Sequence, residues 1–296
     1  MSAKILDGNA LSGVIQAEVR EETTKLINQT GVRPGLAVIL VGDNPASQSY
    51  VRSKAKKSQS IGFHSEVHTH PATSSQEEVA SLVRELNKRD DIHGILIQLP
   101  LPKHLNESEL VELIDPRKDV DGLHPINIGR LSAGLKAFIP CTPFGIREIL
   151  LRNGIKTQGA EVVIVGRSNI VGKPMAQLFL QKGDGGDATV TICHSQTRNI
   201  AEITRRAEIL IAAIGKPLFI KKDMVKPGAT VIDVGINRVE DPSTEKGYHL
   251  VGDVDFINVK EVAGAITPVP GGVGPMTIAM LLKNTLIAAK RALGIE

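Results

Sequence analysis

Cysteine is scarce in this chain. Only Cys141 and Cys193 occur among its 296 residues, and neither belongs to a Cys-x-x-Cys spacing. This pattern excludes a disulfide framework and a cysteine-rich zinc cluster, which need several thiols at characteristic spacings. A reducing compartment suits such a chain, so we expect a cytoplasmic protein.

Long apolar runs are also missing. No stretch approaches the roughly 20 consecutive apolar residues of a membrane-spanning helix. The N-terminal sequence MSAKILDGNALSGVIQ lacks the charged start and continuous apolar run of a signal peptide. We therefore expect no membrane partner.

Excess charge of one sign is absent as well. The net charge is only +3, and no long tract of lysine or arginine appears. A general electrostatic attraction to nucleic acid is therefore not indicated, and we expect no nucleic-acid partner. Small anionic ligands fit this balance better.

Tryptophan is absent, yet the chain has enough apolar residues to form a core. Hydrophobic residues make up 42% of the sequence and charged residues 23%, as in ordinary α/β proteins. The length suits two domains of roughly 100 to 200 residues each.

Apolar stretches of strand length alternate with helical periodicity along the whole chain. In the first half the predicted strands are 35–42, 63–70 and 93–100, with helices near 46–61 and 75–89. In the second half the predicted strands are 161–166, 188–193, 208–215 and 230–235. This alternation predicts βαβ units and a mainly parallel sheet in each half.

Proline and glycine cluster in IPCTPFGI, and we place the domain boundary there. The prediction is an α/β fold of two domains. The first comprises residues 1–140 and is completed by the C-terminal helix 276–296, which returns to pack on it. The second comprises residues 141–275 and is Rossmann-like.

The stretch VVIVGRSNIVGKP resembles a dinucleotide-binding turn with altered spacing. Gly166 permits a tight exit from the strand, but Ser168 stands where the second glycine of G-x-G-x-x-G belongs, and Gly172 comes one residue late. The position, between a strand and a helix start, still suits a phosphate. Ser168 can donate a hydroxyl hydrogen bond, and Pro174 is tolerated in the first helical turn.

The choice between NAD and NADP is usually read at the end of the next strand, where an acidic residue binds the ribose of NAD. Here that strand ends in TICHSQTR, without an acid. Ser195 and the guanidinium of Arg167 suit a 2′-phosphate, which favours NADP. The alternative is that Arg167 and Ser168 are ordinary solvated turn residues.

Three polar positions stand out in the first half. Tyr50 and Lys54 are four residues apart, so they share a helix face, although packing and solubility alone would also explain them. Gln98 closes an apolar strand at its carboxyl end, where ligands bind. Asp119 and Asp121 follow in a predicted turn, where capping or turn hydrogen bonds are the simpler explanation.

The strand HSEVHTH places four metal-binding side chains on one face: His64, Glu66, His68 and His70. A solvated polar face explains them better, and we expect no metal. The segment KGDGGD lacks the glutamate spacing of a calcium loop and is interpreted as an extended turn.

Nine sequence blocks in order resemble the bifunctional methylenetetrahydrofolate dehydrogenase/cyclohydrolase family of the bacterial FolD type. They extend from residue 50 to residue 277: YVRSK, IQLPLP, KDVDGLHPIN, PCTPFGI, VGRSNIVGKP, CHSQT, VIDVGIN, GDVDF and TPVPGGVGPMT. Each block alone is weak evidence, but their shared order is highly specific.

The resemblance implies two reactions of one-carbon metabolism in one cleft between the domains. A hydride passes from 5,10-methylenetetrahydrofolate to NADP, and the 5,10-methenyl product is hydrolysed to 10-formyltetrahydrofolate. By the family motifs, Lys54 is the catalytic lysine, Gln98 is bonded to it, Tyr50 stacks on the aminobenzoate ring and Asp121 binds the pterin. Leu99 and the 270–272 segment (Pro270, Gly271 and Gly272) complete the substrate site.

The resemblance also assigns the cofactor site and the assembly. NADP is expected to contact Gly166, Arg167, Ser168, Ile170, Ser195 and Ile236. A homodimer through the Rossmann half is implied.

Two other functions stay open on sequence grounds. An NADP-dependent dehydrogenase of amino or hydroxy acids would need a basic clamp for a small carboxylate and would leave the set of Tyr50, Lys54 and Gln98 unexplained. A non-catalytic nucleotide-binding protein would be favoured by loss of Lys54, Gln98 or Asp121, and all three are present.

Overall fold

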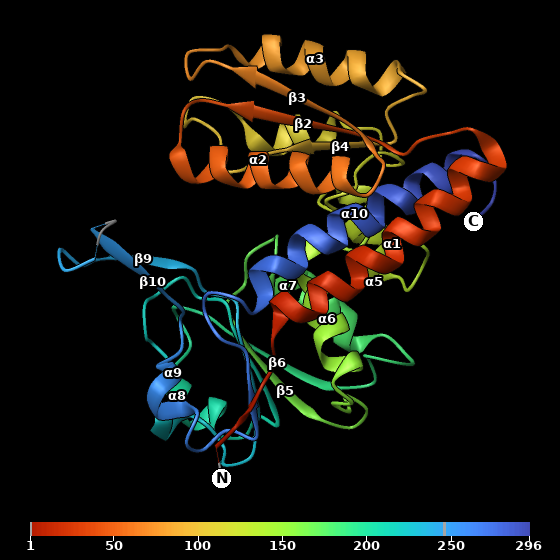
Figure 1. Cartoon of the computed structure of the whole chain (residues 1–296). Helices are drawn as coiled ribbons and strands as arrows, with labels where there is room; N and C mark the ends of the chain where they lie inside the picture. The colour runs from red at the N-terminus through yellow and green to blue at the C-terminus, as the bar shows by residue number, and fades with distance from the viewer. Residues whose placement is uncertain (1, 245–246) are drawn as a thin grey trace. The chain divides into compact units, whose positions relative to one another are not determined.

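The computed structural model describes residues 2–244 and 247–296 and divides into two compact units (Figure 1). We call residues 13–141 and 278–296 the three-stranded unit. Residues 2–12 and the described part of 142–277 form the six-stranded unit.

The three-stranded unit is built on a parallel sheet in the order β3-β2-β4. Its strands are β2 (Gly35–Val41), β3 (His64–His70) and β4 (Gly94–Ile97), and its helices include α2 (Pro45–Ser60), α3 (Gln76–Lys88), α4 (Glu107–Glu112) and α5 (Pro125–Ser132). All residues of β2 and β4 are buried, as expected for strands covered on both faces. Figure 1 shows α3 and α2 on opposite sides of this sheet.

Two long helices complete the three-stranded unit: α1 (Gly8–Thr30) and α10 (Val273–Ala292). Lys290 pairs with Glu22 at 2.8 Å and so joins them. The side chain of Asn284 donates to the carbonyls of Val120 and Ile139, at 2.8 and 3.0 Å. The C-terminal helix therefore packs on the first domain, as predicted.

The six-stranded unit has a fully parallel sheet in the order β1-β11-β8-β7-β5-β6. The strands are β1 (Lys4–Ile5), β5 (Glu161–Val165), β6 (Thr189–Cys193), β7 (Ile209–Ala212), β8 (Thr230–Asp233) and β11 (Ala265–Ile266). Its helices are α6 (Cys141–Arg152, which starts one residue before the unit), α7 (Gly172–Leu180), α8 (Ile200–Thr204), α9 (Phe256–Val259) and the 3-10 turn η1 (Lys222–Met224). Strand β6 lies on one side of β5 and β7 on the other, so the order in which the strands are added to the sheet reverses beside β5. Open α/β sheets bind ligands at such a reversal of strand order.

Two features of this unit differ from the sequence expectation. An antiparallel hairpin, β9 (Asn237–Glu240) and β10 (Tyr248–Val251), follows β8. Strand β1 pairs with β11, so residues 2–12 group with the second half of the chain although we assigned them to the first domain. A two-residue strand has no periodicity to reveal it.

Candidate functional site

Lys54 is the centre of the polar group in the three-stranded unit. It is only 8% exposed, and its Nζ donates a hydrogen bond of 2.9 Å to Oε1 of Gln98. Burial lowers the pKa of Lys54, and the negative charge of Asp121 opposes that shift in part. The lysine is therefore held closer to its neutral form than a surface lysine.

Helix α2 and strand β4 present these side chains. Tyr50 lies one helical turn before Lys54, on the same face, and is 40% exposed. Gln98 directly follows β4, and its amide nitrogen donates to the carbonyl of Leu99 at 2.7 Å. That second bond fixes the orientation in which Oε1 faces Lys54.

Asp119 and Asp121 have different roles. Asp119 is buried and accepts hydrogen bonds from the amides of Leu123 and His124 and from the side chain of Asn127. It is thus the structural residue of the turn. The backbone of Asp119 pairs in parallel with that of Ile95 in β4. This pairing brings Asp121 near the end of β4, where its charge acts on Lys54.

Cys141 is a member of this group that the sequence did not identify. Its thiol is buried and donates to the carbonyl of Val120 at 3.4 Å. Burial and then the charge of Asp121 raise its pKa well above the ordinary value, while Lys54 acts in the opposite direction. Its place in PCTPFGI was the only sequence signal.

The turn after β5 requires glycine at two places. Gly166 has a φ of 141°, and a Cβ there would lie 2.1 Å from the carbonyl oxygen of Ala213, just beyond β7. A Cβ on Gly172 would lie 2.2 Å from the carbonyl oxygen of Gly166. Gly172 therefore allows the start of α7 to pack directly against the turn, beside the point where the strand order of the sheet reverses.

Ser168 stands where a glycine is usual, and its side chain bonds to backbone amides at the start of α7. Its hydroxyl oxygen accepts from the amides of Val171 and Gly172, at 3.1 and 3.4 Å. The hydroxyl group keeps its own hydrogen to donate, and its contact with a phosphate stays a prediction.

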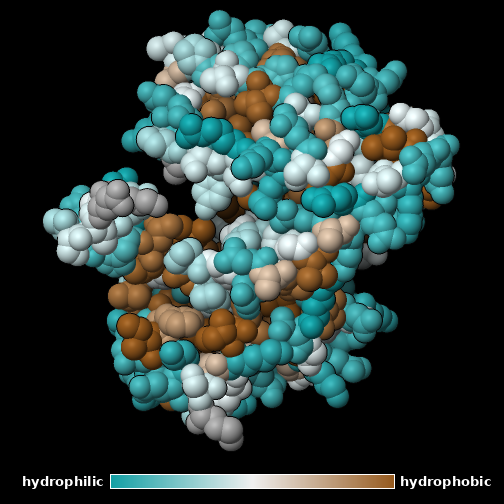
Figure 2. Space-filling view, viewed as in Figure 1, coloured by the Kyte–Doolittle hydropathy of each residue, from teal (hydrophilic) through white to brown (hydrophobic). Residues whose placement is uncertain are grey.

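The neighbouring side chains fit a dinucleotide phosphate. Arg167 and Ser195 are exposed, and Arg167 has no ion-pair partner within residues 2–244 and 247–296. Ile170 and Ile236 are 46% and 48% exposed. Figure 2 shows apolar surface of the six-stranded unit gathered next to the β9–β10 hairpin.

The 270–272 segment belongs to the six-stranded unit, and the Val269–Pro270 peptide is cis. The carbonyl of Gly271 accepts from the amide of Asn9 at 3.1 Å. A Cβ on Gly272 would lie 2.5 Å from the carbonyl oxygen of Pro268. The predicted substrate residues are thus divided between the two units, with Tyr50 to Asp121 in one and this segment in the other.

A pair of buried carboxylates, Asp233 and Asp253, organises the loops after β7 and β8. Asp233 accepts from the amides of Gly235, Asp253 and Val254, and Asp253 accepts from the amides of Ile214 and Gly215. Burial raises the pKa of Asp233 to about 7 although its amide bonds lower it. The sequence signal was an acid ending the apolar strand TVID.

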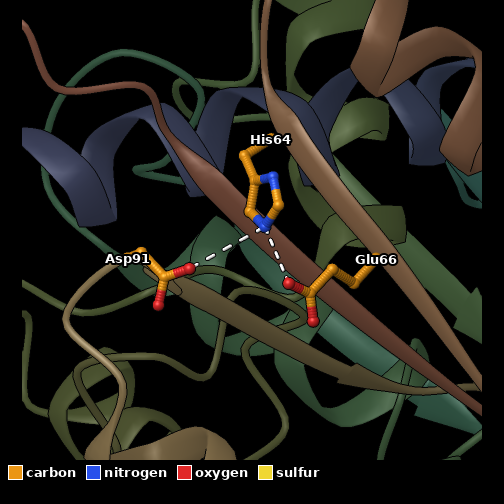
Figure 3. A group of neighbouring side chains, drawn as sticks. All are labelled: His64, Glu66 and Asp91. Atoms are coloured by element: carbon orange, nitrogen blue, oxygen red, sulfur yellow. Dashed lines mark hydrogen bonds and ion pairs between the residues drawn. The ribbon is translucent and has the colours of Figure 1, made fainter.

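Two side chains of β3, His64 and Glu66, form a cluster with Asp91, which precedes β4 (Figure 3). His64 Nε2 lies 2.8 Å from Glu66 and 3.8 Å from Asp91. Arg89 forms two bonds to Glu66, at 2.7 and 2.8 Å, and pairs with Asp91 at 2.6 Å. Arg89 lowers the pKa of Glu66 to about 2, so the cluster already holds a cation and a metal ion would have to displace it. The absence of a metal stays a prediction.

Within the described residues, no helix combines the length and apolarity that crossing a lipid bilayer would need.

Two family models match the chain. The tetrahydrofolate dehydrogenase/cyclohydrolase catalytic domain matches residues 6–121, and the NAD(P)-binding domain of the same family matches residues 140–293. Curated relatives named Bifunctional protein FolD agree along the whole length. The relative from Dehalococcoides mccartyi is 54% identical and covers 100% of this chain and 99% of its own. The relative from Chlorobium limicola is 57% identical and covers 97% and 98%.

Solved structures give the same match. The Campylobacter jejuni FolD methylenetetrahydrofolate dehydrogenase/cyclohydrolase has a TM-score of 0.91 and 48% identity, covering 98% of this chain and 99% of its own. The Trypanosoma brucei enzyme, complexed with NADP cofactor and inhibitor, has a TM-score of 0.94 and 42% identity, covering 99% of both chains.

Proposed function

The chain belongs to the tetrahydrofolate dehydrogenase/cyclohydrolase family, and from that premise we propose how its residues divide the work. Its reactions are the NADP-dependent oxidation of 5,10-methylenetetrahydrofolate and the hydrolysis of the methenyl product to 10-formyltetrahydrofolate. An amino or hydroxy acid dehydrogenase is not favoured by any of these matches.

The observation that carries the proposal is the buried Lys54, held at 2.9 Å by an uncharged partner, Gln98. A lysine that is to accept a proton near pH 7 needs a lowered pKa, and burial supplies it. A bound methenyl cation would lower it further by repulsion of like charges.

In the hydrolysis, water adds through its oxygen to the methenyl carbon and loses a proton to neutral Lys54. The protonated Lys54 then gives that proton to N5 as the bond from the carbon to N5 breaks, and the hydroxyl proton of the adduct leaves to solvent as the carbonyl of the 10-formyl group forms. Gln98 holds Nζ in place without adding charge. This contribution of general base catalysis is worth about 10²- to 10⁴-fold in rate.

Tyr50 and Asp121 bind the substrate in the proposal. Tyr50 is exposed enough to stack on the aminobenzoate ring. Asp121 offers two carboxylate oxygens to the amino-substituted edge of the pterin. Leu99 and the 270–272 segment add apolar and backbone contacts.

The turn at Gly166 is assigned to the cofactor. NADP, when bound, accepts the hydride from the methylene carbon. The residues of this chain hold its phosphates: Ser168 through its hydroxyl group, and Arg167 with Ser195 at the 2′-phosphate. Ile170 and Ile236 offer apolar surface to its rings.

We also propose a homodimer formed through the six-stranded unit, in the cytoplasm and without a nucleic-acid partner. Strand β6 is an edge of the sheet, and Ile192 on it is 38% exposed. An edge strand with exposed apolar side chains is a surface that proteins usually cover. Light scattering should give twice the chain mass, and Ile192→Lys should shift it toward one chain; a monomeric wild type would contradict this.

The activity assay supplies methylenetetrahydrofolate and NADP to the pure protein and follows NADPH together with the methenyl chromophore and its decay. NADPH formation followed by loss of the chromophore is expected. A protein that forms no NADPH would rule out the dehydrogenase assignment.

A further inference from the structure

A cavity lies within the three-stranded unit, and the proposed reactions do not use it. Its volume is about 690 Å³, inside the range of roughly 300 to 1,000 Å³ that is common for small-molecule sites. None of the proposed substrate or cofactor residues lines it.

Among the charged side chains that line this cavity, basic ones outnumber acidic ones. Five basic side chains contribute (Arg117, Lys118, Arg130, Lys136 and Arg291), against the acidic side chains of Asp90 and Glu296. Arg117 is already paired with Asp115, and Lys118 donates to the carbonyls of Leu86 and Arg89.

Two of the basic residues are free to bind a ligand. Nε of Arg130 donates to the carbonyl of Lys136 at 2.6 Å, and its two terminal nitrogens have no partner in the described part of the chain. The ammonium of Lys136 has no partner among residues 2–244 and 247–296. An arginine fork beside a lysine is a combination that suits phosphate oxygens.

His93 adds a buried donor to the same cavity. It is 6% exposed, and its Nδ1 accepts the amide hydrogen of Gly35 at 2.9 Å. A neutral ring bonded in this way carries its own hydrogen on Nε2. No described residue accepts that hydrogen, so it is available to an anion.

Apolar side chains also line the cavity, and we call them its apolar side: Ile92, Ile126, Phe138, Ala288 and Ala292. The guanidinium of Arg291 lies 4.8 Å from the centre of the Phe138 ring and so forms a flat, charged surface above it. Such a plane stacks on the flat rings of nucleobases.

We propose that this cavity binds a small organic phosphate of nucleotide size, with the phosphate on Arg130, Lys136 and His93 and the organic part against the apolar side. A nucleotide that binds here is bound in addition to NADP.

The test is calorimetric titration of ADP into the full-length protein with NADP held at saturation, so that the cofactor turn is filled. One further ADP per chain is expected. In the double variant Arg130→Glu with Lys136→Glu, the dissociation constant should rise at least about tenfold, because charge-assisted hydrogen bonds are lost. The dehydrogenase rate should stay unchanged.

The matched control is Arg20→Glu with Arg84→Glu, which changes the same charge on exposed residues of the same unit outside the cavity. It should bind ADP like the wild type. Equal weakening by the control, or no additional ADP on the wild type, would overturn the proposal.

Two further ligands test the chemical class. Inorganic pyrophosphate lacks the organic part, and citrate lacks phosphate. Both should bind more weakly than ADP. Pyrophosphate binding as tightly as ADP would overturn the role of the apolar side, and tighter binding of citrate would overturn the assignment to phosphate.

Discussion

Nζ of Lys54 and Oε1 of Gln98 lie 2.9 Å apart, and the amide of Gln98 is anchored on the carbonyl of Leu99. This places an uncharged acceptor against a buried lysine whose pKa is lowered by burial. The arrangement orients the lysine and leaves its pKa low. Exchanging the amide nitrogen of Gln98 for an oxygen would add a negative charge beside Nζ and raise that pKa.

Gln98→Glu puts a carboxylate in place of that acceptor. An opposite charge within hydrogen-bond distance raises a lysine pKa by roughly one to three units. Cyclohydrolase activity, which needs neutral Lys54, should therefore shift its rising limb to higher pH. The pH dependence of methenyl decay measures this. Gln98→Leu, which adds no charge, should not move the limb upward; an unchanged profile in Gln98→Glu would contradict the role of Lys54 as the base.

Lys54→Met should abolish hydrolysis while the protein stays folded, because methionine fills the same apolar volume without a basic nitrogen. A loss of about 10²- to 10⁴-fold is expected. The measurement is the decay of added methenyl substrate, with circular dichroism as the check on folding. The control is Lys56→Met on the exposed side of α2, which should hydrolyse normally. Undiminished hydrolysis by Lys54→Met would refute the assignment.

Arg167→Ala should raise KM for NADP much more than KM for NAD, because the lost contact is with the additional phosphate. A charge-assisted hydrogen bond contributes about 1.5 to 3 kcal/mol, so a change of roughly ten- to a hundredfold is expected for NADP. Lys182→Ala is the control, because it removes another exposed cation of the same unit that is not among the proposed cofactor residues. Equal changes for both cofactors would count against a 2′-phosphate at Arg167.

Asp233 predicts a pH dependence of stability. Its pKa is about 7 in the folded protein against an ordinary value of 3.8. Between these values the folded state binds the extra proton, so this group's contribution to the free energy of unfolding falls as pH rises from about 4 to 7. Across this range the contribution of Asp233 to the free energy of unfolding falls by an amount of the order of 4 kcal/mol.

Asp233→Asn removes that titration. The difference in the free energy of unfolding between wild type and variant should be larger at pH 4.5 than at pH 7.5, as measured by urea denaturation. Taking the difference cancels the other titrating groups. Asp223→Asn, in the exposed turn η1, should show no such trend. A difference that is constant with pH would mean that Asp233 titrates normally.

Much of the fold follows from the sequence because the central strands of both sheets are buried on both faces. Runs such as GLAVILV and EVVIV have no polar interruption, so their lengths and the intervening helices identify the parallel sheets. Strand β1 and the β9–β10 hairpin escaped prediction. The first has two residues, and the hairpin is mostly polar, so neither produces a clear period.

The candidate site was predictable where sequence neighbours share a face and not where tertiary contacts bring distant segments together. Tyr50 and Lys54 follow from helical spacing. Cys141 joins Asp121 and Lys54 only through the folded chain, and the Asp233–Asp253 pair links loops that lie 20 residues apart. The cavity lined by Arg130 and Lys136 likewise depends on α10 packing beside residues 87–138, which no local pattern encodes.

Gly166→Ala tests why the altered fingerprint keeps this glycine. Its φ of 141° is strained for any L residue, and the new Cβ would lie 2.1 Å from the carbonyl oxygen of Ala213, so the turn must move. A loss of about 1 to 3 kcal/mol of stability is expected from the backbone strain alone. KM for NADP should rise, because the turn and the start of α7 shift together. Gly13→Ala, in helix α1 with open space around it, is the control and should be neutral or slightly stabilising. If both alanine variants unfold at the same temperature and bind NADP equally, the turn does not need the conformation seen at Gly166.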